Sequence, residues 1–144
     1  MKFLVLNGPN LNLLGLREPD IYGSENYETL CKQIRAHAEK EGVEVYIMQS
    51  NHEGDLVDAI GKAYGVYDGI VINPAAYTHT SIAILDALKA VSIPAVEVHI
   101  SQVDAREPFR QVSYAGMACV KTYQGLGFAG YLRAVSFLKE YLTK

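Results

Sequence analysis

The sequence has 144 residues, a net charge of −3 at pH 7, a hydrophobic fraction of 49% and a charged fraction of 20%. This length predicts one domain, spanning residues 1–144, and the apolar content is ample for a packed core. We find no lysine or arginine run, no long apolar segment and no signal peptide, so we expect a cytoplasmic protein that binds neither nucleic acid nor membrane. Its two cysteines are isolated and suggest no disulfide framework or metal cluster.

Apolar runs alternate with helical patterns along the whole chain. The expected strands span residues 2–7, 43–49, 67–73, 95–100 and 118–123. The expected helices span residues 24–40, 54–64, 80–91 and 128–142, and a short turn or helix is expected at 105–109. Ser24 can cap the first helix, and His79 is expected at the amino terminus of the third, where free N–H groups favour anions.

The regular alternation of strands and helices determines the expected fold class. It implies parallel βαβ units with right-handed crossovers and helices on both faces of one sheet. We therefore predict an α/β fold, a flavodoxin-like three-layer sandwich whose five-stranded parallel sheet has the order 2-1-3-4-5. Ligands of such sheets bind beyond the carboxyl ends of the strands, here in the crevice between the first and third strands.

A long loop leaves the first strand of the predicted sheet. Residues 7–23 read NGPNLNLLGLREPDIYG, and their glycines and prolines interrupt regular structure repeatedly. Loops of this length in a compact domain are usually functional, so we interpret residues 8–24 as a lid that carries Asn10, Arg17 and Tyr22. A neighbouring arginine lowers the pKa of a tyrosine, which would let Tyr22 act as a general base. The alternative is that Tyr22 only packs the loop onto the body of the protein.

Polar residues also follow the third and fourth strands. The sequence NPAAYTHTS brings Asn73 and His79, and in EVHISQ the residues Glu97, His99 and Ser101 alternate with apolar ones and so share one face. Ionisable groups in a strand covered on both faces are unfavourable unless they are paired. A structural Glu–His pair would explain them, but their place at the carboxyl end of the strand favours a histidine oriented to move protons.

Two further charged pairs are weaker candidates. His79 and Asp86 are seven residues apart, which would put them on nearly the same face of the third helix. Arg106 and Arg110 are one helical turn apart and could clamp a carboxylate. A solvated helix face is the default interpretation for Asp86 alone, and spacing alone is equally compatible with a solvated surface pair for the two arginines.

Several sequence blocks together carry a family resemblance. The blocks GPNLNLLGLREPDIYG, INPAAYTHTSIAILDAL, VEVHISQ, ARE with Phe109–Arg110, and QGLGFAGY follow in this order. In these blocks the chain resembles the type II 3-dehydroquinate dehydratases. The resemblance implies a flavodoxin-like subunit that reversibly dehydrates 3-dehydroquinate to 3-dehydroshikimate through an enolate, in the shikimate pathway or in quinate catabolism. It also implies no metal, no organic cofactor and a homododecamer built as a tetramer of trimers.

The resemblance also implies a role for each candidate residue. Tyr22 would be the base, Arg17 would activate it, and Asn10 would hold a water that supports the enolate oxygen. His99 would protonate the leaving hydroxyl, with Glu97 orienting it. The implied substrate-binding residues are Asn73, His79, Asp86, Ile100, Ser101 and Arg110.

For two of these binding roles the resemblance implies a particular type of contact. The backbone N–H groups of Ile100 and Ser101 would meet the substrate carboxylate, and Asp86 would reach the site of a neighbouring subunit. The chain departs from the usual residues of the family at a few neighbouring positions, which are Ala75, Ala76, Gln102 and Asp104.

Other functions of this fold are possible from the sequence. A flavin- or nucleotide-binding protein would need a phosphate cradle after the first strand, where this chain has Pro9 and no P-loop lysine. A receiver-type signalling domain would need an acidic cluster there, where this chain has asparagines. An assembly role without catalysis would leave the face shared by Glu97, His99 and Ser101 unexplained. No lysine lies in a candidate loop, which disfavours imine chemistry.

Overall fold

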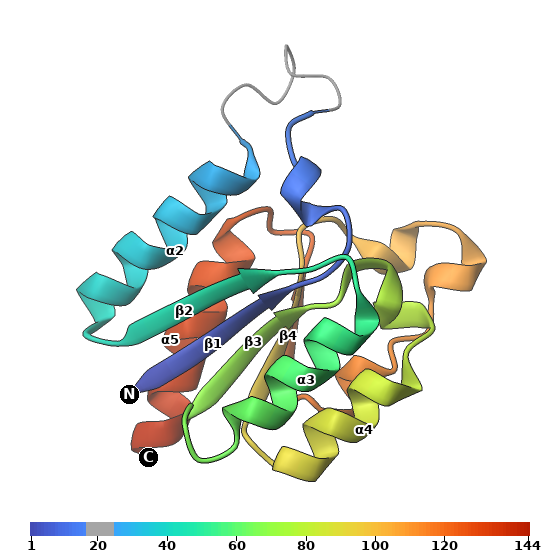
Figure 1. Cartoon of the computed structure of the whole chain (residues 1–144). Helices are drawn as coiled ribbons and strands as arrows, with labels where there is room; N and C mark the ends of the chain where they lie inside the picture. Colours follow the sequence, from blue (N-terminus) through green and yellow to red (C-terminus); the bar gives the residue numbers. More distant parts are fainter. Residues whose placement is uncertain (17–24) are drawn as a thin grey trace.

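The structure is a computed structural model that describes residues 1–16 and 25–144, apart from the side chain of Asp104. A five-stranded sheet forms its centre, with the order β2-β1-β3-β4-β5 and parallel pairing throughout (Figure 1). The predicted class, sheet and strand order are therefore confirmed. The strands are β1 (Lys2–Asn7), β2 (Glu44–Gln49), β3 (Gly69–Asn73), β4 (Ala95–His99) and β5 (Lys121–Gln124).

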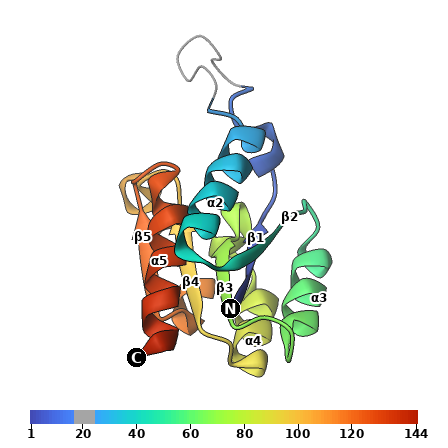
Figure 2. The ribbon, with the colours of Figure 1, turned by 90° about the vertical axis from the view of Figure 1, so that its left-hand side faces the viewer.

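Helices cover both faces of the sheet, as the alternating pattern predicts. Figure 2 shows α2 and α5 on one side of the sheet and α3 and α4 on the other. The helices are α2 (Tyr27–Glu41), α3 (Glu53–Ala63), α4 (Ile82–Val91) and α5 (Ala129–Thr143). Short 3-10 helices are η1 (Leu11–Leu13), η2 (Ala75–His79), η3 (Val103–Ala105), η4 (Pro108–Arg110) and η5 (Ala115–Ala118). No helix among the described residues is long and apolar enough to cross a membrane.

The hydrophobic core has two halves, one on each face of the sheet. Successive side chains of a strand point to opposite faces, so Phe3 and Val5 pack toward α2 and α5 whereas Leu4 and Leu6 pack toward α3 and α4. Every residue of β3 and β4 is buried. The central strands are thus covered on both sides, so their carboxyl ends and the loops that follow are where a ligand is expected.

The helix starts differ from the predicted ones because other residues cap them. Asn26 caps α2, where its Oδ1 accepts a hydrogen bond from Thr29 N at 2.9 Å. The predicted cap, Ser24, lies outside the described residues. Ser81 caps α4 through a 3.0 Å hydrogen bond from Ile84 N. His79 ends η2 instead, so the prediction that it shares a helix with Asp86 is wrong.

The segment between β4 and β5 also differs from its prediction. Residues 115–118 form η5, and β5 begins only at Lys121. Arg106 follows η3 whereas Arg110 ends η4, so the two arginines do not lie on one helix. Within the predicted lid, the described residues 8–16 contain η1.

Candidate active site

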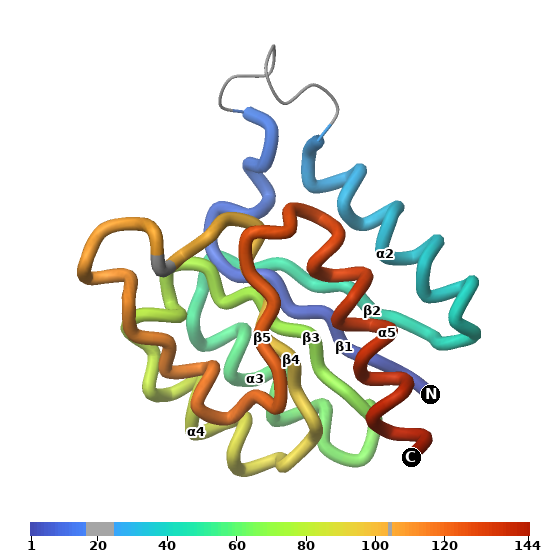
Figure 3. Tube along the Cα trace, turned by 180° about the vertical axis from the view of Figure 1, so that it is seen from behind, coloured from blue at the N-terminus to red at the C-terminus, as the bar shows by residue number. Residues whose placement is uncertain are grey.

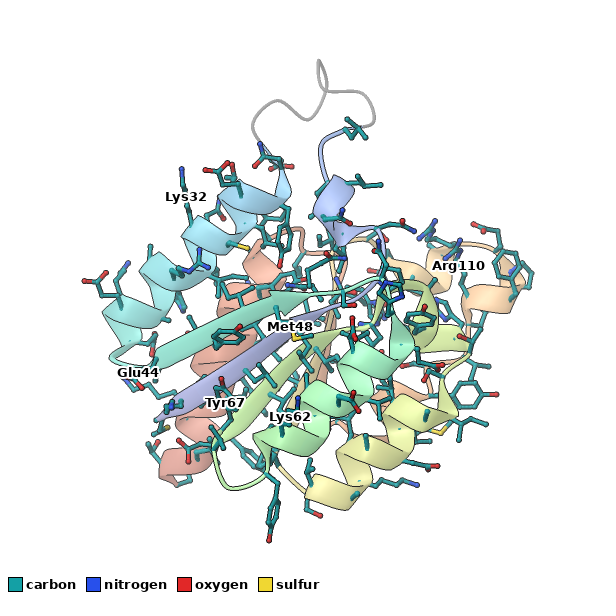
Figure 4. The ribbon with its side chains drawn as sticks, viewed as in Figure 1. Lys32, Glu44, Met48, Lys62, Tyr67 and Arg110 are labelled. Carbon is teal, nitrogen blue, oxygen red and sulfur yellow. The ribbon has the colours of Figure 1, made fainter. Side chains whose placement is uncertain are left out.

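A pocket of about 600 Å³ opens at the carboxyl ends of β1, β3 and β4. The parallel register places Asn7 opposite Asn73, so the loops that follow β1 and β3 leave the sheet side by side. In Figure 4, Arg110 lies at this edge, away from Glu44 and Tyr67 at the amino ends of the strands. The predicted site residues that line the pocket are Asn10, Asn73, His79, His99, Ile100, Ser101 and Arg110.

The remaining predicted residues lie elsewhere. Glu97 lines a smaller adjoining pocket of about 190 Å³, which shares His79, His99 and Arg110 with the first. Asp86 is exposed on α4 and is not among the described residues that line either pocket. Arg17 and Tyr22 lie outside the described residues.

Glu97 and His99 form a buried pair at the end of β4. The Nε2 of His99 lies 2.7 Å from Oε2 of Glu97, and the two side chains are only 8% and 2% exposed. Glu97 also accepts hydrogen bonds from the hydroxyl of Ser113 and, at 2.9 Å, from that of Thr122. The carboxylate is therefore held by three donors from β4, β5 and the segment between them.

These donors determine the charge of Glu97. Burial alone would raise the pKa of its carboxyl, but the hydrogen bonds from His99, Ser113 and Thr122, together with the charge of His99, lower the pKa below the ordinary value of 4.5. Glu97 is consequently ionised at neutral pH. An ionised carboxylate only accepts hydrogen bonds, so His99 donates to it from Nε2.

Asn73 is oriented by contacts on both ends of its side-chain amide. Its Nδ2 donates to the hydroxyl of Tyr131 at 2.9 Å, and its Oδ1 accepts from Ala75 N at 3.1 Å. The Tyr131 hydroxyl in turn donates to Oδ1 of Asn7 at 2.7 Å. Sequence reasoning missed Tyr131, because a tyrosine in the buried stripe of a helix resembles an ordinary core residue.

The loop after β2 holds Asn10 in place. Asn10 adopts a left-handed conformation with φ of 69°, and its backbone N donates to Oδ1 of Asn51 at 3.0 Å. Gln49 donates from Nε2 both to the same oxygen and to the carbonyl of Gly8, each at 3.1 Å. Tyr77 of η2 donates its hydroxyl to the carbonyl of Asn51 at 2.7 Å. Sequence reasoning did not select this loop, although Ser50 and Asn51 directly follow the second predicted strand.

Gly8 lets the loops after β1 and β3 approach closely. A Cβ at this position would lie 2.3 Å from the carbonyl oxygen of Pro74, which no side chain can accommodate. The Gly8 N–H donates to the carbonyl of Asn73 at 2.8 Å. A glycine is therefore required for the two loops to form one wall of the pocket.

The cationic side of the pocket comes from Arg106, which follows η3, and Arg110, which ends η4. The Nε of Arg110 pairs with Oε2 of Glu107 at 2.9 Å, whereas Arg106 lies 3.9 Å from the same carboxylate. His79 contacts the carbonyl of Val112 through Nδ1 at 2.8 Å, and because a carbonyl only accepts, Nδ1 is the donor. Among the described residues, no group of three or more histidine, cysteine or acidic side chains could hold a metal ion.

Comparison with known proteins shows the family of this chain. Residues 1–139 match the family described as class II dehydroquinase. The chain belongs to the class II dehydroquinase family. The chain is 52% identical to the 3-dehydroquinate dehydratase of Clostridium acetobutylicum over 144 residues, which cover all of both chains. It is 54% identical to that of Corynebacterium glutamicum over 137 residues, which cover 95% of this chain and 94% of the relative.

Solved structures give the same result. The type II dehydroquinase from Butyrivibrio crossotus superposes with a TM-score of 0.91 at 52% identity, covering 96% of this chain and 97% of that chain. The enzyme from Propionibacterium acnes gives a TM-score of 0.88 at 37% identity, covering 96% and 98% of the two chains. The resemblance seen in the sequence is confirmed, and the flavin-binding and receiver alternatives are set aside.

Proposed function

We propose that this chain catalyses the reversible dehydration of 3-dehydroquinate to 3-dehydroshikimate as a lyase of the shikimate pathway. Full-length identity above 50% to proteins named for this reaction supports the proposal. The observation within the structure that carries it is the buried His99–Glu97 pair at the wall of the pocket. A histidine held by an ionised carboxylate is suited to protonate a leaving hydroxyl.

The proposed mechanism requires a base, an oxyanion stabiliser and an acid. Tyr22, activated by Arg17, takes the proton from the carbon next to the substrate ketone, and the electron pair forms an enolate. Asn10 holds a water that stabilises the enolate oxygen. The enolate then collapses, the C–O bond to the leaving hydroxyl breaks, and His99 donates a proton so that water departs. One proton is thus taken up by the enzyme and one is released in each turnover.

Substrate binding is assigned to residues that meet at the same pocket. The substrate carboxylate binds to the backbone N–H groups of Ile100 and Ser101, while Asn73, His79 and Arg110 bind the remaining polar groups. Because Nδ2 of Asn73 donates one hydrogen to Tyr131, its second hydrogen is the one that serves the substrate.

We also propose that the subunit assembles into a homododecamer, a tetramer of trimers, in which Asp86 reaches the site of a neighbour. Asp86 is exposed on α4 and lines neither pocket of its own subunit. Large apolar side chains on α4 and on the segment between β4 and β5 are exposed, as expected for a surface that is buried by association. These side chains are Ile82, Phe109, Val112 and Met117.

The decisive test is direct turnover. Purified protein treated with a chelator should convert 3-dehydroquinate to a product with the ultraviolet absorbance of a conjugated enone. Activity should survive borohydride in the presence of substrate, because the proposed route has no imine. Tyr22→Phe should fold normally and lose nearly all turnover. Absence of product from the unmodified chain would reject the proposed function.

A further inference from the structure

The turn between β5 and α5 lies against the segment that leaves β4. Figure 3 shows this turn, residues 124–127, beside the orange chain that follows β4. Its two glycines donate their N–H groups to the carbonyls of three consecutive residues. The distances are 3.3 Å from Gly125 N to His99 O, 3.2 Å from Gly125 N to Ser101 O, and 3.1 Å from Gly127 N to Ile100 O.

These hydrogen bonds determine where the neighbouring N–H groups point. No cis peptide bond occurs among the described residues, and in a trans peptide the C=O and N–H groups point in opposite directions. Since the carbonyls of His99 and Ile100 face the turn, the N–H groups of Ile100 and Ser101 face away from it. The large pocket is lined by Ile100 and Ser101, and residues 124–127 are not among its described lining residues. Both N–H groups are therefore directed to the pocket side of the chain.

The turn is itself built to hold this segment. Gly125 and Gly127 have φ values of 75° and 61°, a left-handed region that is unfavourable for residues with a Cβ. The side-chain Oε1 of Gln124 accepts a hydrogen bond from Val103 N at 3.1 Å. The turn thus contacts the segment from residue 99 to residue 103, including the part proposed to bind the substrate carboxylate.

We propose that the 124–127 turn positions the two N–H groups of Ile100 and Ser101 and so determines the affinity of the enzyme for the carboxylate of its substrate. This inference rests on the proposed function. It assigns a role to QGLG, the glycine-rich start of QGLGFAGY, whose N–H groups bind the protein's own carbonyls. Gln124 and Gly127 are accordingly positioning residues.

The test compares two glycines that have similar left-handed backbone conformations. Gly127 and Gly65 have φ values of 61° and 76°, and a Cβ on either would meet no atom within 4 Å. Gly65 precedes β3, at the edge of the sheet opposite the pocket. Gly127→Ala and Gly65→Ala therefore add similar backbone strain without a clash, but only the first disturbs the turn. Gly127→Asn is the conservative variant, since asparagine tolerates the left-handed region.

The readouts are kcat, KM for 3-dehydroquinate, and the inhibition constant of its primary amide as a competing ligand. Hydrogen bonds to a carboxylate act in the ground state and the transition state alike, so their loss changes KM and not kcat. Gly127→Ala should raise KM roughly tenfold, the loss expected for weakened charge-assisted hydrogen bonds, with little change in kcat or in binding of the neutral amide. Gly127→Asn should restore most of the affinity, and Gly65→Ala should match the unmodified enzyme.

Each other outcome has a defined meaning. Equal weakening of acid and amide, or a fall in kcat at constant KM, would overturn the proposed role of the turn. If Gly127→Ala fails to fold, Gln124→Ala repeats the test, because it removes the side-chain acceptor of the hydrogen bond from Val103 N. An unmodified enzyme without turnover would reject the proposed function itself, and this inference with it. An active enzyme whose variants keep their KM would reject the inference alone.

Discussion

The hydroxyl of Tyr131 on α5 accepts a hydrogen bond of 2.9 Å from the side-chain amide of Asn73 at the end of β3. Both side chains are almost fully buried, with exposed fractions of 0% and 3%. Tyr131 also donates to Asn7, so one hydroxyl joins the ends of β1 and β3 below the pocket. Burial raises the pKa of Tyr131, despite the opposing hydrogen bond from Asn73, so the hydroxyl keeps its proton and remains a donor.

Tyr131→Phe should therefore impair both stability and activity. Removing the hydroxyl leaves the Nδ2 of Asn73 and the Oδ1 of Asn7 without this buried partner, which lowers the free energy of unfolding by about 1–3 kcal/mol. Without this hydrogen bond the Asn73 amide is no longer held in its orientation at the pocket, which should also lower kcat/KM. Urea unfolding and steady-state kinetics measure the two effects. Tyr64→Phe is the control, because Tyr64 is 72% exposed. Equal stability of the two variants would show that the buried hydroxyl contributes nothing.

Asn51→Ala should lower kcat because Asn51 positions Asn10. Its Oδ1 accepts the hydrogen bond from Asn10 N, which holds the left-handed residue next to the pocket. Loss of this contact should reduce kcat by about tenfold, the size expected for one misplaced stabilising group. Asn51→Asp keeps an acceptor oxygen and should retain more activity.

A double-mutant cycle determines whether Asn51 acts through Asn10. In an Asn10→Ala background, Asn51→Ala should add little further loss of kcat, because the group that it positions is already gone. Fully additive losses would mean that Asn51 supports the site by another route. Thermal unfolding of each variant separates a catalytic effect from a general loss of stability.

The lowered pKa of Glu97 predicts a specific pH dependence of stability. A carboxyl whose pKa is lower in the folded state than its ordinary 4.5 stabilises the fold fully above that pH, and the contribution is lost as the pH falls toward the folded-state value. Glu97→Gln should therefore unfold with a weaker pH dependence below about pH 4.5 than the unmodified protein. Denaturant unfolding from pH 3 to 7 measures this difference.

A matched surface substitution controls for a general effect of charge removal. Glu28 pairs with Lys32 on α2, but its side chain is 77% exposed, so solvent screens the pair. Glu28→Gln should leave the acid limb of the stability curve unchanged. If Glu97→Gln behaves in the same way, the buried pair with His99 is not the source of the acid sensitivity.

Asp86→Ala should reduce activity while each subunit stays folded, because Asp86 is exposed and contacts neither pocket of its own chain. If Asp86 serves a neighbouring site, hybrids of Asp86→Ala and His99→Ala subunits contain some sites in which both residues are intact. Mixing the two impaired proteins after dissociation should then restore part of the turnover. Failure of hybrids to recover activity, with assembly verified by light scattering, would argue against a shared site.

Hydrophobic periodicity was sufficient to predict the fold. Continuous apolar runs identified the central strands, and alternation with helices predicted a parallel sheet whose order the structure confirms. The carboxyl ends of the strands also indicated which loops converge, because parallel strands all end at the same edge of the sheet. Element starts were less accurate: Ser81 and Asn26 act as caps through hydrogen bonds that depend on local backbone conformation.

Sequence patterns were thus sufficient to predict the fold class, the family and the edge of the sheet at which Asn10, Asn73 and His99 lie. Only the tertiary structure identified what holds those residues, because the contacts join segments that no local pattern connects. Tyr131 lies 58 positions from Asn73, and Asn51 lies 41 from Asn10. Periodicity reports which side of an element is buried, whereas the partner of a buried polar atom depends on how distant loops pack and on the requirement that such atoms be hydrogen-bonded.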